Sequence, residues 1–174
     1  MEIIGNQVIL RRISERDKDL LLDLSQDSAA TKITAGYASP KSYIHPIRVF
    51  YSLQNSASHL PCIIADKENP RVGWGMIILS HMDSGRGAAE IYIKLIKSAR
   101  KKGYAQDAIN TLVFHAFHNL GLNYLYANIQ EHNTASQKSF EQCGFKRECM
   151  HQGRADSYGN QRNIYVYGIT SSMS

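Results

Sequence analysis

The feature that most constrains the fold is a change of hydrophobic period across a basic, glycine-containing turn in the middle of the chain. Residues 89–95 alternate apolar and polar side chains, with Glu90, Tyr92 and Lys94 on one face, as a half-buried β-strand requires. Beyond the turn, apolar residues recur at spacings of three and four over 105–116, which predicts an amphipathic α-helix. The pattern therefore predicts a strand, a turn and a helix in direct succession.

The segments on either side predict an α/β domain with a mixed central sheet flanked by helices. We expect strands at 7–12, 60–65, 72–79, 89–95, 124–129, from Phe145 and at 164–169, and helices after Ser14, at 47–53, from Ala105 and from Asn133 to Cys143. The order is then β-α-α-β-β-β-α-β-α-β-β. Because 174 residues suffice for one core but not for two ordinary domains, we expect a single domain over 1–174.

Composition and motifs argue against several other classes of protein. Residues 1–6 lack a basic and apolar leader, and no apolar run approaches the ~20 residues that cross a bilayer, so we expect a cytoplasmic protein without a membrane partner. Cys62, Cys143 and Cys149 are an odd number at irregular spacing, which indicates reduced thiols. Cys143, Cys149 and His151 lack a C-x-x-C pair and a fourth ligand at a zinc-site spacing, so we predict no metal. Dinucleotide-binding and P-loop signatures are missing from the sequence.

Residues 100–105, Arg-Lys-Lys-Gly-Tyr-Ala, place a basic turn at the expected N-terminus of the central helix. The first turn of a helix leaves backbone N–H groups without intrahelical partners and carries a partial positive charge, so a phosphate can accept several hydrogen bonds there. Gly103 and Ala105 are small enough to let a phosphate approach the backbone closely. A glycine chosen only for the conformation of the turn is the alternative, and it stays open.

Two segments in the right order resemble the GCN5-related N-acetyltransferase (GNAT) superfamily. Residues 100–105 resemble its Q/R-x-x-G-x-G/A signature, and residues 133–145 resemble its N-x-x-S-x-x-x-(Y/L)-x-x-x-G-F segment. The tail at 153–168 is similar to the branch that acetylates ribosomal-protein N-termini, although Asn163 stands where that branch usually has Asp. The resemblance covers about 6–169 and implies the mixed α/β fold of that superfamily.

The resemblance also implies acetyl-CoA as co-substrate. It implies that residues 100–105 hold the pyrophosphate and that the strand from Glu90 lies beside the pantetheine arm, where backbone amides polarise the thioester carbonyl. Asn133 is implied to contact the same arm, but it suits a helix N-cap equally well. The predicted cofactor-binding residues are Ile91, Tyr92, Ile93, Arg100, Lys101, Lys102, Gly103, Tyr104, Ala105, Asn133 and Ser136.

Direct acetyl transfer needs a neutral amine, a polarised carbonyl and a route for protons. Glu90 is the candidate general base, directly or through water; the alternative is a polar residue at the solvent end of a strand. Many members of the superfamily protonate the departing thiolate with a Tyr where this chain has Phe140, which has no proton to give. Ser139 is the candidate catalytic hydroxyl, and Ser136 or a water could serve instead.

The predicted function is transfer of an acetyl group from acetyl-CoA to a primary amine. The acceptor is either a protein N-terminal α-amine or a small molecule such as a polyamine or an aminoglycoside, and a homodimer stays open. A net charge of +5 and a pI of about 9.1 fit any anionic partner. The alternative is therefore a basic nucleic-acid-binding or regulatory domain that retains the fold without catalysis, although nucleic acid is the less expected partner.

Overall fold

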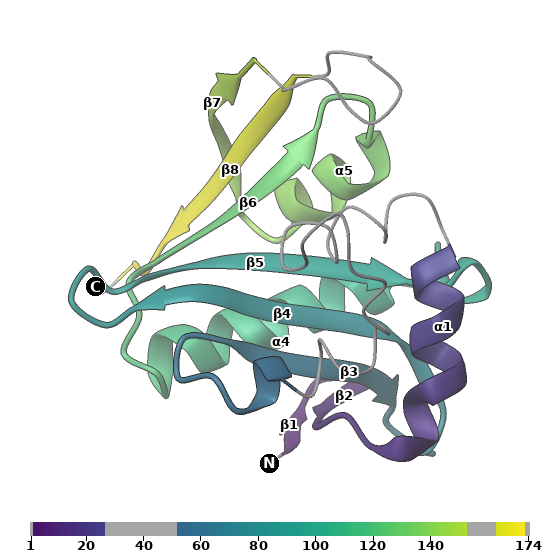
Figure 1. Cartoon of the computed structure of the whole chain (residues 1–174). Helices are drawn as coiled ribbons and strands as arrows, with labels where there is room; N and C mark the ends of the chain where they lie inside the picture. The colour runs from purple at the N-terminus through teal and green to yellow at the C-terminus, as the bar shows by residue number, and fades with distance from the viewer. Residues whose placement is uncertain (1, 27–51, 153–162, 173–174) are drawn as a thin grey trace, which may run out of the picture.

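The computed structural model describes residues 2–26, 52–152 and 163–172, which contain one mixed sheet in the order β1-β2-β3-β4-β5-β6-β8-β7 (Figure 1). Only β5 and β6 run parallel; the other neighbours in the sheet are antiparallel. The strands are β1 (Glu2–Ile4), β2 (Val8–Arg11), β3 (Leu60–Asp66), β4 (Gly73–Asp83), β5 (Ala88–Leu95), β6 (Tyr124–Gln130), β7 (Lys146–His151) and β8 (Ile164–Thr170). The helices are η1 (Glu15–Asp17), α1 (Lys18–Gln26), η2 (Lys97–Ala99), α4 (Tyr104–His118) and α5 (Thr134–Gln142).

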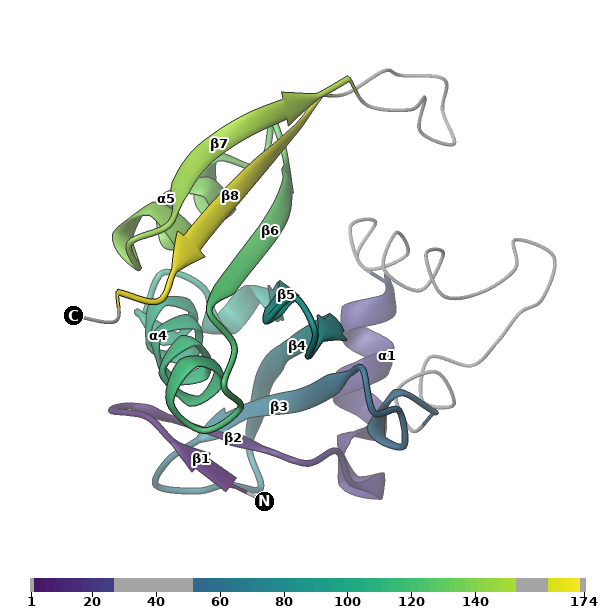
Figure 2. The ribbon, with the colours of Figure 1, turned by 90° about the vertical axis from the view of Figure 1, so that its left-hand side faces the viewer.

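Helices cover both faces of the sheet (Figure 2). α4 packs against β1, β2 and β5 on one face, and α1 packs against β4 on the other. The apolar stripe of α4 explains its position, because Ala108, Ile109 and Leu112 are fully buried in the larger of two core clusters. The smaller cluster lies beneath α1 and includes Leu21 and Leu24. None of the helices described is long and apolar enough to span a membrane.

The predicted α/β class is confirmed, and so is the order of elements over the described residues, with one difference at the N-terminal side. The short strand β1 was not predicted, because three residues are too few to show a period. The helix expected at 47–53 falls almost wholly outside the described residues. The two faces predicted for β5 are confirmed, since Ala89 and Ile91 lie in the core while Glu90 is partly exposed.

The start of the chain is held against α4 by one carboxylate. The Asp107 side chain accepts hydrogen bonds from the backbone N–H groups of Asn6, Gln7 and Val8, at 3.0, 2.7 and 2.9 Å. Gly5 allows this close approach, because a Cβ at that position would lie 2.8 Å from the same carboxylate. The β1–β2 turn is thereby fixed beside the first turns of α4.

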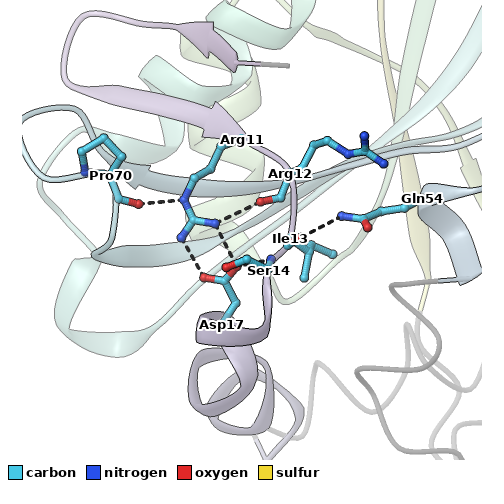
Figure 3. Close-up of polar contacts among 7 residues, drawn as sticks. All are labelled: Arg11, Arg12, Ile13, Ser14, Asp17, Gln54 and Pro70. Atoms are coloured by element: carbon cyan, nitrogen blue, oxygen red, sulfur yellow. Dashed lines mark hydrogen bonds and ion pairs between the residues drawn. The ribbon is translucent and has the colours of Figure 1, made fainter.

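A buried ion pair joins β2 to η1 and to the β3–β4 turn (Figure 3). Asp17 is 2% exposed and accepts hydrogen bonds from both terminal nitrogens of Arg11, at 2.7 and 2.8 Å, and from the Ser14 backbone N–H at 2.8 Å. Arg11 Nε donates to the Pro70 carbonyl at 2.7 Å. Burial by itself would raise the pKa of Asp17, but the Arg11 guanidinium and the Ser14 donors outweigh it and lower the pKa.

Candidate active site

The sheet opens between β5 and β6, its only parallel neighbours. Their pairing stops after three residue pairs, of which Glu90–Tyr126 is the last, and the strands then diverge (Figure 1). β5 continues along β4 to Leu95, whereas β6 follows β8 to its end at Gln130. A cavity of about 380 Å³ lies between the diverging ends. Its lining includes residues 90–94 of β5, residues 127–130 of β6, Ile78, Ser80 and His81 of β4, Asn133, Ser136 and Phe140 at α5, and His132 and Ile164.

Glu90 lies where the strands begin to separate, and its carboxylate is the only one among the described residues that line the cavity. Asn128 of β6 donates a hydrogen bond to Glu90 Oε1 at 3.0 Å. The Nε2 atom of His81 lies 3.7 Å from Glu90 Oε2. With a side chain 22% exposed, Glu90 can exchange a proton with a molecule in the cavity.

The start of α5 forms another wall of the cavity. Asn133 caps the helix, since its Oδ1 accepts a hydrogen bond from the Ser136 backbone N–H at 3.2 Å, and both residues line the cavity. Phe140 also lines it, is 2% exposed and packs edge-to-face on Phe145 with ring centroids 4.9 Å apart. Ser139 does not line the cavity, and its hydroxyl donates to the Ala135 carbonyl at 3.1 Å. The position of Ser139 therefore gives no support to its predicted role.

The basic turn follows the end of β5 that the cavity borders, although residues 100–105 do not themselves line the cavity. Arg100 donates to the Leu95 carbonyl from Nε at 3.2 Å and from Nη2 at 3.1 Å, which fixes the turn to the end of the strand. Lys101 and Lys102 are exposed, and Gly103 is the N-cap of α4 with φ +84°.

The first turn of α4 is suited to an anionic ligand. No described side chain caps this helix, in contrast to Asn133 at α5, so its first N–H groups can bind a phosphate. A Cβ built on Gly103 would meet only Gln7 Nε2, at 3.4 Å, so the space above the turn is open. Tyr104 stacks on Trp74 with ring centroids 5.5 Å apart and steadies the helix start. These features fit the pyrophosphate of a coenzyme A thioester, and Ala105 adds no bulk there.

Two residues that line the cavity, Asn128 and His81, were not predicted from the sequence. The alternation in β6 shows only that Asn128 is a polar residue of a strand. Its hydrogen bond to Glu90 depends on the register between β5 and β6, which the sequence does not reveal. His81 could not be predicted as a cavity residue, because a β-bulge turns it toward the cavity and a bulge has no reliable sequence signature.

The three cysteines are free thiols, as predicted. Burial raises the pKa of Cys62 to about 12 and that of Cys143 to about 11, so neither is a ready nucleophile. The Sγ atom of Cys149 lies 3.9 Å from His151 Nε2 on the exposed strand β7. Among the described residues, no three His, Cys, Asp or Glu side chains are grouped to hold a metal ion.

Comparison with known proteins connects this geometry to a family. The family model described as "Acetyltransferase (GNAT) domain" matches residues 7–146. The chain is 27% identical over 172 residues to a protein of Bacillus licheniformis with the name "Uncharacterized N-acetyltransferase p20", across 94% of this chain and 92% of that protein.

Solved structures share the fold over nearly the whole chain. The spermidine N-acetyltransferase of Vibrio cholerae, in complex with CoA and spermine, has a TM-score of 0.79 at 19% identity, covering 95% of this chain and 96% of that one. A proposed ribosomal-protein-serine acetyltransferase of Vibrio cholerae has a TM-score of 0.72 at 17% identity, covering 98% and 97%.

Proposed function

The chain belongs to the GNAT acetyltransferase family, and we propose that it transfers the acetyl group of acetyl-CoA to a primary amine in the cavity between β5 and β6. The early end of the β5–β6 pairing is the observation that supports this most directly, because it leaves room for two substrates beside the Glu90 carboxylate. The acceptor is a protein N-terminal α-amine or a small-molecule amine, a choice that fits similar structures named as a spermidine N-acetyltransferase and as a proposed ribosomal-protein-serine acetyltransferase.

The chain's own residues divide the binding of acetyl-CoA between two places. The first-turn N–H groups of α4, with Lys101 and Lys102, would hold the pyrophosphate. The edge of β5 over 91–93 would align the pantetheine arm, and the Asn133 side chain lies on the facing wall. Acetyl-CoA supplies an activated thioester that an amine can attack directly.

Proton transfer falls to a small set of cavity residues. An amine reaches the protein mainly as an ammonium ion, and Glu90, which lines the cavity, would accept the proton that must leave before attack. A thiol with a pKa of ~8.5 forms a thiolate that is a tolerable leaving group without protonation. Phe140 cannot protonate it. Ser136, rather than Ser139, is the α5 hydroxyl that we propose for this step, because it lines the cavity.

Thermal unfolding with acetyl-CoA or with a short DNA duplex tests the class of function. A ligand at ~100 times its Kd that binds only the native state adds roughly 2.7 kcal/mol, so acetyl-CoA should raise the Tm clearly. A shift caused by the duplex alone and lost steeply with salt would support the nucleic-acid alternative instead. Release of free thiol with spermidine and with peptides bearing N-terminal serine or alanine then identifies the acceptor class.

A matched pair of glycine variants tests the pyrophosphate site. Gly103 (φ +84°) and Gly121 (φ +70°) flank α4 in the same left-handed conformation, so Gly103→Glu and Gly121→Glu should lose similar stability, roughly 1–2 kcal/mol. Only Gly103→Glu should also lose the Tm increase from acetyl-CoA, because it places a negative charge where phosphate would bind. Normal acetyl-CoA binding by Gly103→Glu would contradict the proposed site.

A further inference from the structure

The end of β4 contains a β-bulge beside the cavity. Pairing of β4 with β5 is regular up to Ser80–Glu90 and resumes at Asp83–Ala88, so two residues of β4 oppose one residue of β5. His81 is the first of these two and has φ +52°, a conformation that few residues other than glycine adopt. A residue kept in such a conformation is a candidate for a functional role.

The bulge changes where His81 points. Side chains alternate between faces along a regular strand, so His81 would normally face away from Ser80. Here both residues line the cavity, and His81 Nε2 lies 3.7 Å from Glu90 Oε2. The His81 side chain is 58% exposed. The imidazole is therefore close to the Glu90 carboxylate and in contact with solvent.

The groups around His81 favour an outward path for a proton. His59, which precedes β3, lies edge-on to His81 with ring centroids 5.7 Å apart. Burial, and then the charge of His81, lowers the pKa of His59, so a proton on His81 is not readily passed inward. Lys94 and His132 also line the cavity, but neither is a carboxylate that could give His81 a proton. Glu90 is the only carboxylate among the described residues that line the cavity, and its Oε2 is close enough to His81 for proton exchange.

We propose that His81 is a positioning residue that relays protons from Glu90 to solvent, an inference that rests on the proposed function. The ammonium acceptor loses an N–H proton to Glu90, which becomes a neutral carboxylic acid. That O–H proton then passes to Nε2 of neutral His81, across a gap that a small rotation or one water closes. The imidazolium releases a proton to water, and Glu90 is again a carboxylate ready for the next acceptor.

The test uses His81→Gly, because glycine adopts the left-handed conformation without strain and leaves a space that free imidazole can enter. With acetyl-CoA and either spermidine or an N-terminal serine hexapeptide, we expect kcat to fall about 10-fold, since water replaces a positioned base imperfectly. The KM for acetyl-CoA should not change. Added imidazole should restore kcat, more so at a pH where it is unprotonated. His151→Gly on β7, outside the cavity, is the matched control and should show neither effect.

A second readout needs no turnover. In the unliganded protein, the His81 ring ¹³C–¹H NMR signal should shift in Glu90→Gln, whereas the His151 signal should not. Three results would each overturn the relay but not the proposed function. The first is a wild-type kcat in His81→Gly, and the second is a fall in kcat that added imidazole does not restore. The third is a His81 NMR signal that does not shift in Glu90→Gln. A wild-type protein that acetylates neither acceptor would overturn the relay together with the proposed function.

Discussion

Two carboxylates of the molecule are held in opposite ways. Asp17 is 2% exposed, and Arg11 and Ser14 donate hydrogen bonds to both of its oxygens. Glu90 is 22% exposed; Asn128 donates a hydrogen bond to one oxygen, and the Nε2 atom of His81 lies 3.7 Å from the other. The saturated carboxylate stabilises the fold, whereas the incompletely bonded one can take part in chemistry.

The largest expected effect is on stability at Asp17. Asp17→Asn leaves the guanidinium of Arg11, whose side chain is only 12% exposed, without its counter-charge, which should lower the free energy of unfolding by about 3–5 kcal/mol. Urea unfolding followed by circular dichroism measures this. Asp23→Asn, at an exposed position of α1, is the control and should stay within ~0.5 kcal/mol of wild type. Equal losses in the two variants would remove the distinction between Asp17 and an ordinary surface carboxylate.

The next effect is on catalysis at Glu90. Glu90→Gln keeps an oxygen for Asn128 but cannot accept the amine proton, so kcat should fall by ~10²-fold while the free energy of unfolding changes little. Steady-state kinetics beside urea unfolding separates the two quantities. Glu68→Gln, in the exposed β3–β4 turn, should behave as wild type. If Glu90→Gln kept its full kcat, deprotonation would belong to solvent rather than to this carboxylate.

Acid should distinguish the same two carboxylates by a smaller effect. Because the pKa of Asp17 is lowered in the folded protein, its contribution to stability is complete above the ordinary carboxyl pKa of 3.8 and is lost as pH falls through the lower folded value. The stability gap between wild type and Asp17→Asn should therefore be constant from neutral pH to about 5 and shrink below about 4. A gap that stayed constant to pH 2 would show that the ion pair does not control acid stability.

The smallest expected effect resolves the two roles of Asn133. Asn133→Ala removes the N-cap of α5 and should cost about 1 kcal/mol of stability. Asn133→Ser restores a capping oxygen and should recover most of that stability. Serine still lacks the longer amide side chain that Asn133 contributes at the cavity wall. Urea unfolding and the KM for acetyl-CoA report the two roles separately. A normal KM in both variants would leave Asn133 as a cap only.

The fold was predictable because most elements carry a complete hydrophobic period. The alternation in β5 and the three-and-four spacing of α4 each span enough residues to identify the element and the face it buries. β1 has only three residues and gains its place through pairing with β2, which is a tertiary interaction. Propensity alone could not have shown it.

The candidate site was predictable only in part, for a physical reason. Glu90, Asn133 and Ser136 could be located because the segments that resemble the GNAT superfamily are regular elements, and all three residues line the cavity. The neighbours of Glu90 could not, because Asn128 depends on the parallel register and His81 on one extra residue in β4. Ser139 does not line the cavity, and its hydroxyl donates a hydrogen bond to the Ala135 carbonyl of its own helix, a local interaction that the spacing does not reveal.

The opening between β5 and β6 also has a consequence for aggregation. A strand edge that faces solvent is a template on which another chain can add a strand. In this protein, the edges created by the split face each other across the cavity inside the sheet, where a strand from a second molecule cannot easily reach them. The outer edges are β1, which has three residues, and β7, which begins Lys-Arg-Glu. A short edge and an edge that begins with three charged side chains are both poor templates for an added strand, so the sheet can open for a substrate without offering a new edge for strand addition.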